Sequence, residues 1–167
     1  IERAVNRNNK EAFVADRKRY GDAAGAGSKV EAEYALRVAK RNVLRHRVAT
    51  RLRLVAADWV CALAPDARFD VIVSNPPYVT PPEYERVPPE VRAEPKEALC
   101  GGEDGLLFYR RTFAEALPHL ADDGLLALEL NPYLADEVRR MARNAGLRTR
   151  VLADHYGLER VLLAFWR

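Results

Sequence analysis

The segment 69–79, FDVIVSNPPYV, decides the fold, because a run of β-branched apolar residues leads directly into Asn75-Pro76-Pro77-Tyr78. Such a run is typical of a buried central strand, so a strand is predicted over residues 69–75. Proline has no backbone N–H to donate to a sheet, so the strand has to end where the prolines begin. Ligands bind at the carboxyl ends of the strands in open α/β sheets. The sequence therefore predicts that this strand delivers the tetrapeptide to a ligand-binding edge.

Helical and strand patterns alternate around this segment. Helices are predicted over 34–47, 106–120 and 134–145, and further strands over 51–58, 125–130, 149–154 and 160–166. Residues 80–95 carry five prolines and are predicted to form an extended loop. The link 155–159 is too short for a parallel crossover, so the last two strands are predicted to form an antiparallel hairpin. The pattern predicts an α/β fold whose sheet is mostly parallel with one reversed strand.

Length and composition favour a single ordinary domain. With 167 residues, we predict one domain over 1–167, in which residues 1–20 form at most one polar helix. No apolar run approaches the ~18 residues that span a bilayer, and no secretory signal is present, so we expect a cytoplasmic protein without membrane contact. The net charge of +3 suits an acidic or nucleic-acid partner without requiring one. The cysteines and histidines lack metal-site spacing, so no metal is expected.

The tetrapeptide suits one chemical task. The nitrogen of an amide or aromatic amino group is a poor nucleophile, because its lone pair is delocalised. Two acceptors for its N–H groups favour the positive charge that develops on the nitrogen as it attacks a sulfonium methyl group. The Asn75 side-chain carbonyl and the Pro76 backbone carbonyl can supply them, while the prolines fix the backbone and Tyr78 offers a flat face for stacking. A lone Asn-Pro pair would indicate a turn, whereas the full tetrapeptide after a buried strand favours a catalytic site.

Residues 74–79, Ser-Asn-Pro-Pro-Tyr-Val, resemble the signature of amino-group methyltransferases. A closer resemblance, to the HemK/PrmC family of protein-glutamine N5-methyltransferases, is carried by Glu94-Pro95, Ala98-Leu99, Gly101-Gly102-Glu103-Asp104-Gly105-Leu106 and Phe108-Tyr109-Arg110. This resemblance extends over about residues 35–167.

The resemblance implies a Rossmann-like class I methyltransferase that uses S-adenosyl-L-methionine and methylates the glutamine of the Gly-Gly-Gln motif in peptide-chain release factors. Asn75 and Tyr78 would bind the glutamine side chain, and Pro76 would contribute its carbonyl. Pro77 would complete the substrate site, and Asn75 would also lie beside the cofactor. We expect the loop 101–105 to shape the site without being catalytic.

The resemblance also suggests residues for the cofactor. Asp58, at the end of a predicted strand, would accept a hydrogen bond from the adenine amino group. Gly25 and Gly27 resemble part of the family's glycine-rich turn. Glu31 is the candidate for the ribose hydroxyls, with Glu33 as the alternative.

The family pattern runs from an apolar strand through the glycine-rich turn and a helix to a second strand that ends in an acid. Too few residues follow Gly27 for that helix, so the first βα unit is predicted to be incomplete. Either residues are missing around 21–30, which we favour, or the chain binds the cofactor weakly. The stretch 1–20 is also too short for the helical domain with which the family contacts release factors.

Three alternatives stay open. The same tetrapeptide suits an adenine or other amino methyltransferase acting on DNA or RNA, which would have to capture a base. A glutamine of a ribosomal protein is a closer alternative substrate. A non-catalytic scaffold with the methyltransferase fold would explain the irregular glycine region, although the intact tetrapeptide argues against it.

Overall fold

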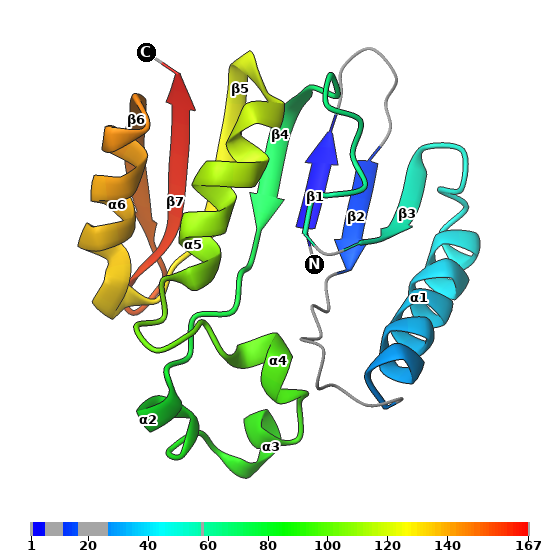
Figure 1. Ribbon diagram of the computed structural model, residues 1–167, viewed down its shortest axis with the longest axis horizontal. Helices are drawn as coiled ribbons and strands as arrows, with labels where there is room; N and C mark the ends of the chain where they lie inside the picture. Colours follow the sequence, from blue (N-terminus) through cyan, green and yellow to red (C-terminus); the bar gives the residue numbers. More distant parts are fainter. Residues whose placement is uncertain (1, 6–11, 17–26, 58, 167) are drawn as a thin grey trace.

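The computed structural model describes residues 2–5, 12–16, 27–57 and 59–166, which form one seven-stranded sheet in the order β3-β2-β1-β4-β5-β7-β6 (Figure 1). The strands are β1 (Glu2–Val5), β2 (Ala12–Asp16), β3 (Leu52–Ala56), β4 (Phe69–Ser74), β5 (Leu120–Glu129), β6 (Leu147–Ala153) and β7 (Glu159–Trp166). β2 to β6 run in one direction, whereas β1 and β7 are antiparallel to both of their neighbours. The predicted α/β class and the C-terminal hairpin of β6 and β7 are confirmed.

The polar helix expected within residues 1–20 is wrong, because the structure has two strands there. β1 pairs with β4, and β2 pairs with β3, so both strands complete one end of the sheet. Their apolar cores, Ala4-Val5 and 12–15, are too short for a helical period to show in the sequence. The link 6–11 is too short for a crossover helix, and β1 accordingly runs antiparallel to β2. The prediction that too few residues follow Gly27 for a helix is wrong, because α1 (Gly27–Arg45) begins there and connects the parallel strands β2 and β3.

The α-helices are α1 (Gly27–Arg45), α2 (Pro81–Tyr84), α3 (Pro89–Arg92), α4 (Lys96–Leu99), α5 (Leu107–Arg111) and α6 (Ala135–Asn144). They differ from the sequence predictions at three places. The helix predicted over 106–120 is α-helical only in α5 and continues as a π-helix (Thr112–Ala116) and a 3-10 helix (Leu117–His119). α1 begins at Gly27 rather than at residue 34. The proline-rich segment is not extended but forms the single-turn helices α2 to α4, because proline is well placed at or just before a first helical turn. Within the described part of the chain, no helix has the length and apolar character needed to span a membrane.

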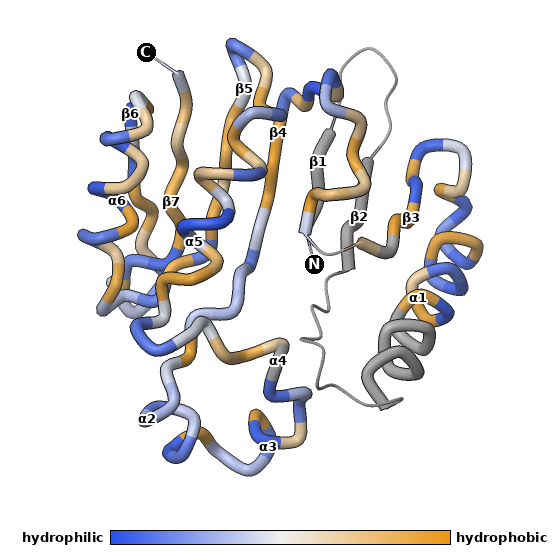
Figure 2. The backbone as a smooth tube through the Cα atoms, in the orientation of Figure 1, coloured by the Kyte–Doolittle hydropathy of each residue, from blue (hydrophilic) through white to orange (hydrophobic). Residues whose placement is uncertain are grey.

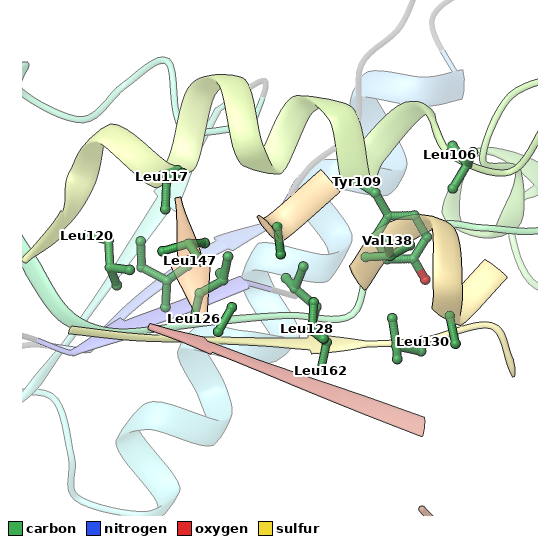
Figure 3. Close-up of a cluster of buried hydrophobic side chains, with 14 of the residues drawn as sticks. Leu106, Tyr109, Leu117, Leu120, Leu126, Leu128, Leu130, Val138, Leu147 and Leu162 are labelled. Carbon is green, nitrogen blue, oxygen red and sulfur yellow. The ribbon is translucent and has the colours of Figure 1, made fainter. Parts of the chain in front are cut away.

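The core lies between the sheet and the layer of α5 and α6 (Figure 3). Leu126 and Leu128 of β5 and Leu162 of β7 are fully buried there, beneath Tyr109 of α5 and Val138 of α6. Each fully buried leucine contributes roughly 1.5–3 kcal/mol of burial free energy. α1 packs on β2 and β3, at the end of the sheet away from α6. Figure 2 shows the apolar β4 running into the more hydrophilic segment of α2 and α3. The core thus holds the carboxyl ends of β4 and β5 in fixed positions.

Candidate functional site

The carboxyl end of β4 opens onto a hollow at the edge of the sheet. Ser74 is buried and pairs with Leu128 of β5, so Asn75 follows beside Glu129, the last residue of β5. The hollow has a volume of about 360 Å³ and is lined by Val73, Ser74, Asn75, Ala127, Leu128, Glu129 and Val161. This volume suits a small ligand or the end of a protein side chain. The strand therefore delivers the tetrapeptide to the sheet edge, as the sequence predicts.

Two oxygens of the tetrapeptide have no hydrogen bond among the described residues. The Asn75 side chain is exposed, and its amide has no hydrogen-bond partner among the described residues. Pro76 is buried, and within the same part of the chain its carbonyl accepts no hydrogen bond. Both prolines restrict the backbone that carries these oxygens. Neither oxygen therefore has to break a hydrogen bond with the described residues before it accepts an N–H group.

Tyr78 is held by the neighbouring strand. Its half-buried side chain donates a hydrogen bond to Glu129 Oε1 at 3.2 Å. Burial raises the pKa of the Tyr78 hydroxyl, and the nearby charge of Glu129 raises it further, so the group stays protonated at neutral pH. Tyr109 donates to the Glu129 backbone oxygen at 3.0 Å and accepts from the Asn131 N–H at 3.2 Å. The end of β5 is thus fixed beside the tetrapeptide.

Two glycines downstream lie against the backbone of the tetrapeptide. A Cβ on Gly101 would stand 2.5 Å from the Tyr78 Cα and 2.8 Å from the Pro77 oxygen. A Cβ on Gly105 would stand 2.6 Å from the Tyr78 oxygen. The Gly101 N–H also donates to the Val79 carbonyl at 2.9 Å. Because only glycine permits so close an approach, this loop shapes the site, as the sequence predicts.

A second set of hydrogen bonds ties α2 to the chain beyond β5. Glu83 Oε2 accepts from the Thr80 N–H at 2.8 Å and from the Thr80 hydroxyl at 2.7 Å. Burial acts to raise the pKa of Glu83, but hydrogen bonds from Thr80 and Asn131 outweigh it and lower the pKa. Asn131 is itself buried and accepts from the Tyr133 N–H at 3.0 Å. The start of the proline-rich segment is therefore anchored next to the hollow.

The residues predicted to bind the cofactor are only partly covered by the structure. Gly25 and Asp58 lie outside the described residues, Gly27 is the first residue of α1, and Glu31 lies within α1. The prediction that the glycine-rich turn comes before the strand that ends in an acid is wrong. β2 ends in Asp16 and precedes the glycines, which lead into α1. The contacts of Gly25, Gly27, Glu31 and Asp58 with a cofactor stay predictions.

Asp16 is an acid that the sequence did not identify as part of a site. The apolar run before it covers only residues 12–15 and charged residues follow it, so no clear strand pattern marks this position in the sequence. β2 ends at Asp16, which pairs in register with Ala56 at the end of β3, and α1 begins at the same edge (Figure 1). A carboxylate at a strand end suits a ribose diol, and a helix N-terminus suits a carboxylate group.

Glu129 was also missed, although the sequence contained a signal. It is the one acid in the predicted strand 125–130, LLALEL, and it comes near the strand's carboxyl end. An acid at the end of a buried strand of an α/β sheet lies at the ligand-binding edge. The same reasoning that selected Asn75 on β4 therefore applies to Glu129 on β5.

Comparison with known proteins finds glutamine methyltransferases among the relatives of the chain. No family model matches the chain. It is 38% identical over 131 residues to a release factor glutamine methyltransferase of Rhodopirellula baltica, covering 77% of this chain and 44% of the relative. It is 42% identical over 132 residues to that of Cereibacter sphaeroides, covering 78% and 47%. A ribosomal protein uL3 glutamine methyltransferase of Bradyrhizobium diazoefficiens is 46% identical over 96 residues, covering 58% and 30%. The chain spans about half the length, or less, of these curated relatives.

A solved structure shares the fold. The crystal structure of a methyltransferase from Pyrococcus furiosus superposes with a TM-score of 0.59 at 23% sequence identity, covering 92% of this chain and 60% of that chain. At this level of identity the likeness concerns the fold alone. The sheet described above therefore has the same fold as the sheet of that methyltransferase.

Proposed function

Because this chain is a sequence relative of the release factor glutamine methyltransferases, we propose that it transfers a methyl group to the side-chain nitrogen of a protein glutamine. The proposed acceptor is the glutamine of the Gly-Gly-Gln motif of a release factor. The observation that carries the proposal is the exposed Asn75 side chain, which lines the hollow and has no hydrogen-bond partner among the described residues. The exposed position of Asn75 is compatible with a protein substrate, which would extend only one side chain into the site.

The chemistry follows from the two oxygens. A glutamine amide would donate one N–H to the Asn75 side-chain carbonyl and the other to the Pro76 carbonyl. These contacts strengthen as positive charge develops on the nitrogen, so they stabilise the transition state more than the ground state. Tyr78 would pack its ring against the amide plane and limit rotation. The protein therefore contributes positioning and charge stabilisation, and no strong base is required.

We propose S-adenosyl-L-methionine as the cofactor, which supplies an electrophilic methyl group on its sulfonium sulfur. Asp16 would accept hydrogen bonds from the ribose, and Gly27 at the start of α1 would lie near the amino-acid part. Asp58 is proposed for the adenine amino group, as its place after β3 suggests. Glu31 is the alternative for the ribose.

A separate observation favours a second candidate substrate. The uL3 methyltransferase of Bradyrhizobium is 46% identical, a higher value than either release factor enzyme, although over a shorter stretch. A glutamine of ribosomal protein uL3 is therefore the second candidate. Both substrates place the enzyme in the compartment where proteins are synthesised, so we propose a cytoplasmic location.

The test is peptide mass spectrometry after incubation with S-adenosyl-L-methionine and either a release factor or uL3. We expect one added methyl group on the glutamine of the Gly-Gly-Gln peptide. A release factor with glutamate at that position is the control, because a carboxylate has no N–H groups to donate. Methylation confined to uL3 supports the second candidate. Methylation of added DNA or RNA, or no transfer to any substrate, contradicts the proposal.

A further inference from the structure

Glu129 lies between two tyrosines and the hollow. Its Oε1 accepts the hydrogen bond of Tyr78, its backbone oxygen accepts that of Tyr109, and its side chain lines the hollow beside Asn75. The backbone contact and the β5–β7 pair of Glu129 with Val161 leave the strand end little freedom to move. Glu129 is therefore a fixed support rather than a mobile surface acid.

The Tyr78 ring, in contrast, depends on this support. Tyr78 follows two prolines and is only half-buried, so packing alone restricts its ring less than it restricts the fully buried Tyr109. The bond to Glu129 is the one hydrogen bond of the Tyr78 hydroxyl among the described residues. Hydrogen bonds to a charged acceptor are stronger than neutral ones, so this contact sets the direction of the ring.

We propose that Glu129 is a positioning residue of the methyl-transfer site, which holds the Tyr78 ring against the acceptor side chain and does not itself contact that side chain. This inference rests on the proposed function. A misplacement of about 1 Å in a group that orients a reacting nitrogen can cost up to ~100-fold in rate, so the support of the ring is expected to show in turnover.

The kinetic test is a double-mutant cycle of Glu129→Ala and Tyr78→Phe, with a release factor as substrate. Each single change should lower kcat about tenfold and change KM for the release factor less than about threefold, because alignment rather than binding is lost. In the Tyr78→Phe background, Glu129→Ala should cost less than about twofold more, because the contact is already absent. Glu129→Gln keeps an acceptor oxygen and should retain more than about a third of the wild-type turnover.

Two kinetic results would overturn the inference. If Glu129→Ala lowers turnover equally with and without the Tyr78 hydroxyl, Glu129 acts directly on a ligand. If it leaves kcat unchanged in the wild-type background, Tyr78 does not need the support. Glu137→Ala is the matched control, since Glu137 pairs with Arg140 on α6 and should leave kcat unaltered.

A spectroscopic readout separates this inference from the proposed function. When the tyrosines of the protein are labelled with carbon-13, the NMR signal of Tyr78 is identified as the one that is absent from Tyr78→Phe. The pH titration of this signal can be followed without any substrate. In Glu129→Gln the pKa of Tyr78 should fall toward the ordinary value of 10.0, because the negative charge beside the hydroxyl is gone. An unaltered titration overturns the inference even if methyl transfer is observed. A shifted titration with no methyl transfer by the wild-type chain would reject the proposed function but leave the contact established.

Discussion

A Cβ on Gly101 would stand 2.5 Å from the Cα of Tyr78, a separation that real Cβ atoms do not reach. The glycine tract and the tetrapeptide are therefore one structural unit, although more than twenty residues separate them in the sequence. The absence of a side chain at this point lets the loop before α5 hold the acceptor oxygens in place.

Gly101→Ala is therefore expected to impair both stability and turnover. The added methyl group meets backbone atoms of Tyr78 and Pro77, which cannot rotate away as a flexible side chain can. We expect a loss of about 1–3 kcal/mol in the free energy of unfolding, as for other overpacked sites, together with a fall in methyl transfer. Denaturant unfolding and the release factor assay measure the two effects.

Gly157→Ala is the matched control for this prediction. Gly157 has a φ of +79° in the turn between β6 and β7, with no atom within 4 Å of an added Cβ. The change should cost about 1 kcal/mol through backbone strain and leave turnover intact. Equal loss of turnover in both variants would mean that Gly101 matters only through general stability.

Tyr109→Phe should lower the free energy of unfolding at neutral pH. It should also make this free energy depend less on pH in the alkaline range. The change leaves the Glu129 carbonyl and the Asn131 N–H without their buried partner, which costs about 1–3 kcal/mol. Burial raises the pKa of Tyr109 in the folded state above the ordinary 10.0. Above pH 10.0 the unfolded chain loses this proton while the folded chain keeps it, so wild-type stability falls as pH rises.

Melting temperatures recorded from about pH 8 to about pH 11 test this prediction, since that range spans the ordinary titration of tyrosine. The wild type should lose stability above pH 10 more steeply than Tyr109→Phe. Parallel curves for the two proteins would show that Tyr109 is not buried as described.

Substitutions of Asp16 and Glu31 are expected to have different effects on cofactor binding. If Asp16 binds the ribose, Asp16→Asn should weaken binding of S-adenosylhomocysteine by about 10–100-fold, as expected for a lost hydrogen bond to a charged group, and Glu31→Gln should have little effect. Titration calorimetry of both variants and of Asp58→Ala measures this. If Glu31→Gln weakens binding and Asp16→Asn does not, Glu31 is the residue that binds the ribose. Unaltered affinity in Asp58→Ala would show that Asp58 does not bind the adenine. No binding by the wild type would favour the scaffold alternative.

The sequence predicted the central and C-terminal parts of the fold well, because the patterns there are long and bounded by clear signals. β4 and the hairpin of β6 and β7 were predicted with small errors at their ends. Gly146 adopts a φ of +86° just after α6, as expected of a residue that ends a helix. The position of Asn75 at the sheet edge followed from the same reasoning, since a strand direction and a proline stop determine it.

The N-terminal strands and the supporting residues of the site could not be predicted in the same way. β1 and β2 are short, and their place in the sheet depends on pairing with β4 and β3, which are distant in sequence. The contact of Tyr78 with Glu129 likewise depends on the register between β4 and β5, which no local pattern reveals. The close approach of Gly101 to Tyr78 is a packing relationship of the same kind.

The central claim is that the Asn75 and Pro76 oxygens accept the hydrogen bonds of an NH2 group. The turnover of Asn75→Ala tests this claim most directly. With saturating release factor and S-adenosyl-L-methionine, we expect methylation of the Gly-Gly-Gln glutamine to fall by about 100–1,000-fold, as when one preorganised hydrogen-bonding group is removed from a transition state. The melting temperature should stay close to that of the wild type, because Asn75 is exposed, and Asn144→Ala at the exposed end of α6 should leave turnover unchanged. Wild-type turnover in Asn75→Ala would contradict the account.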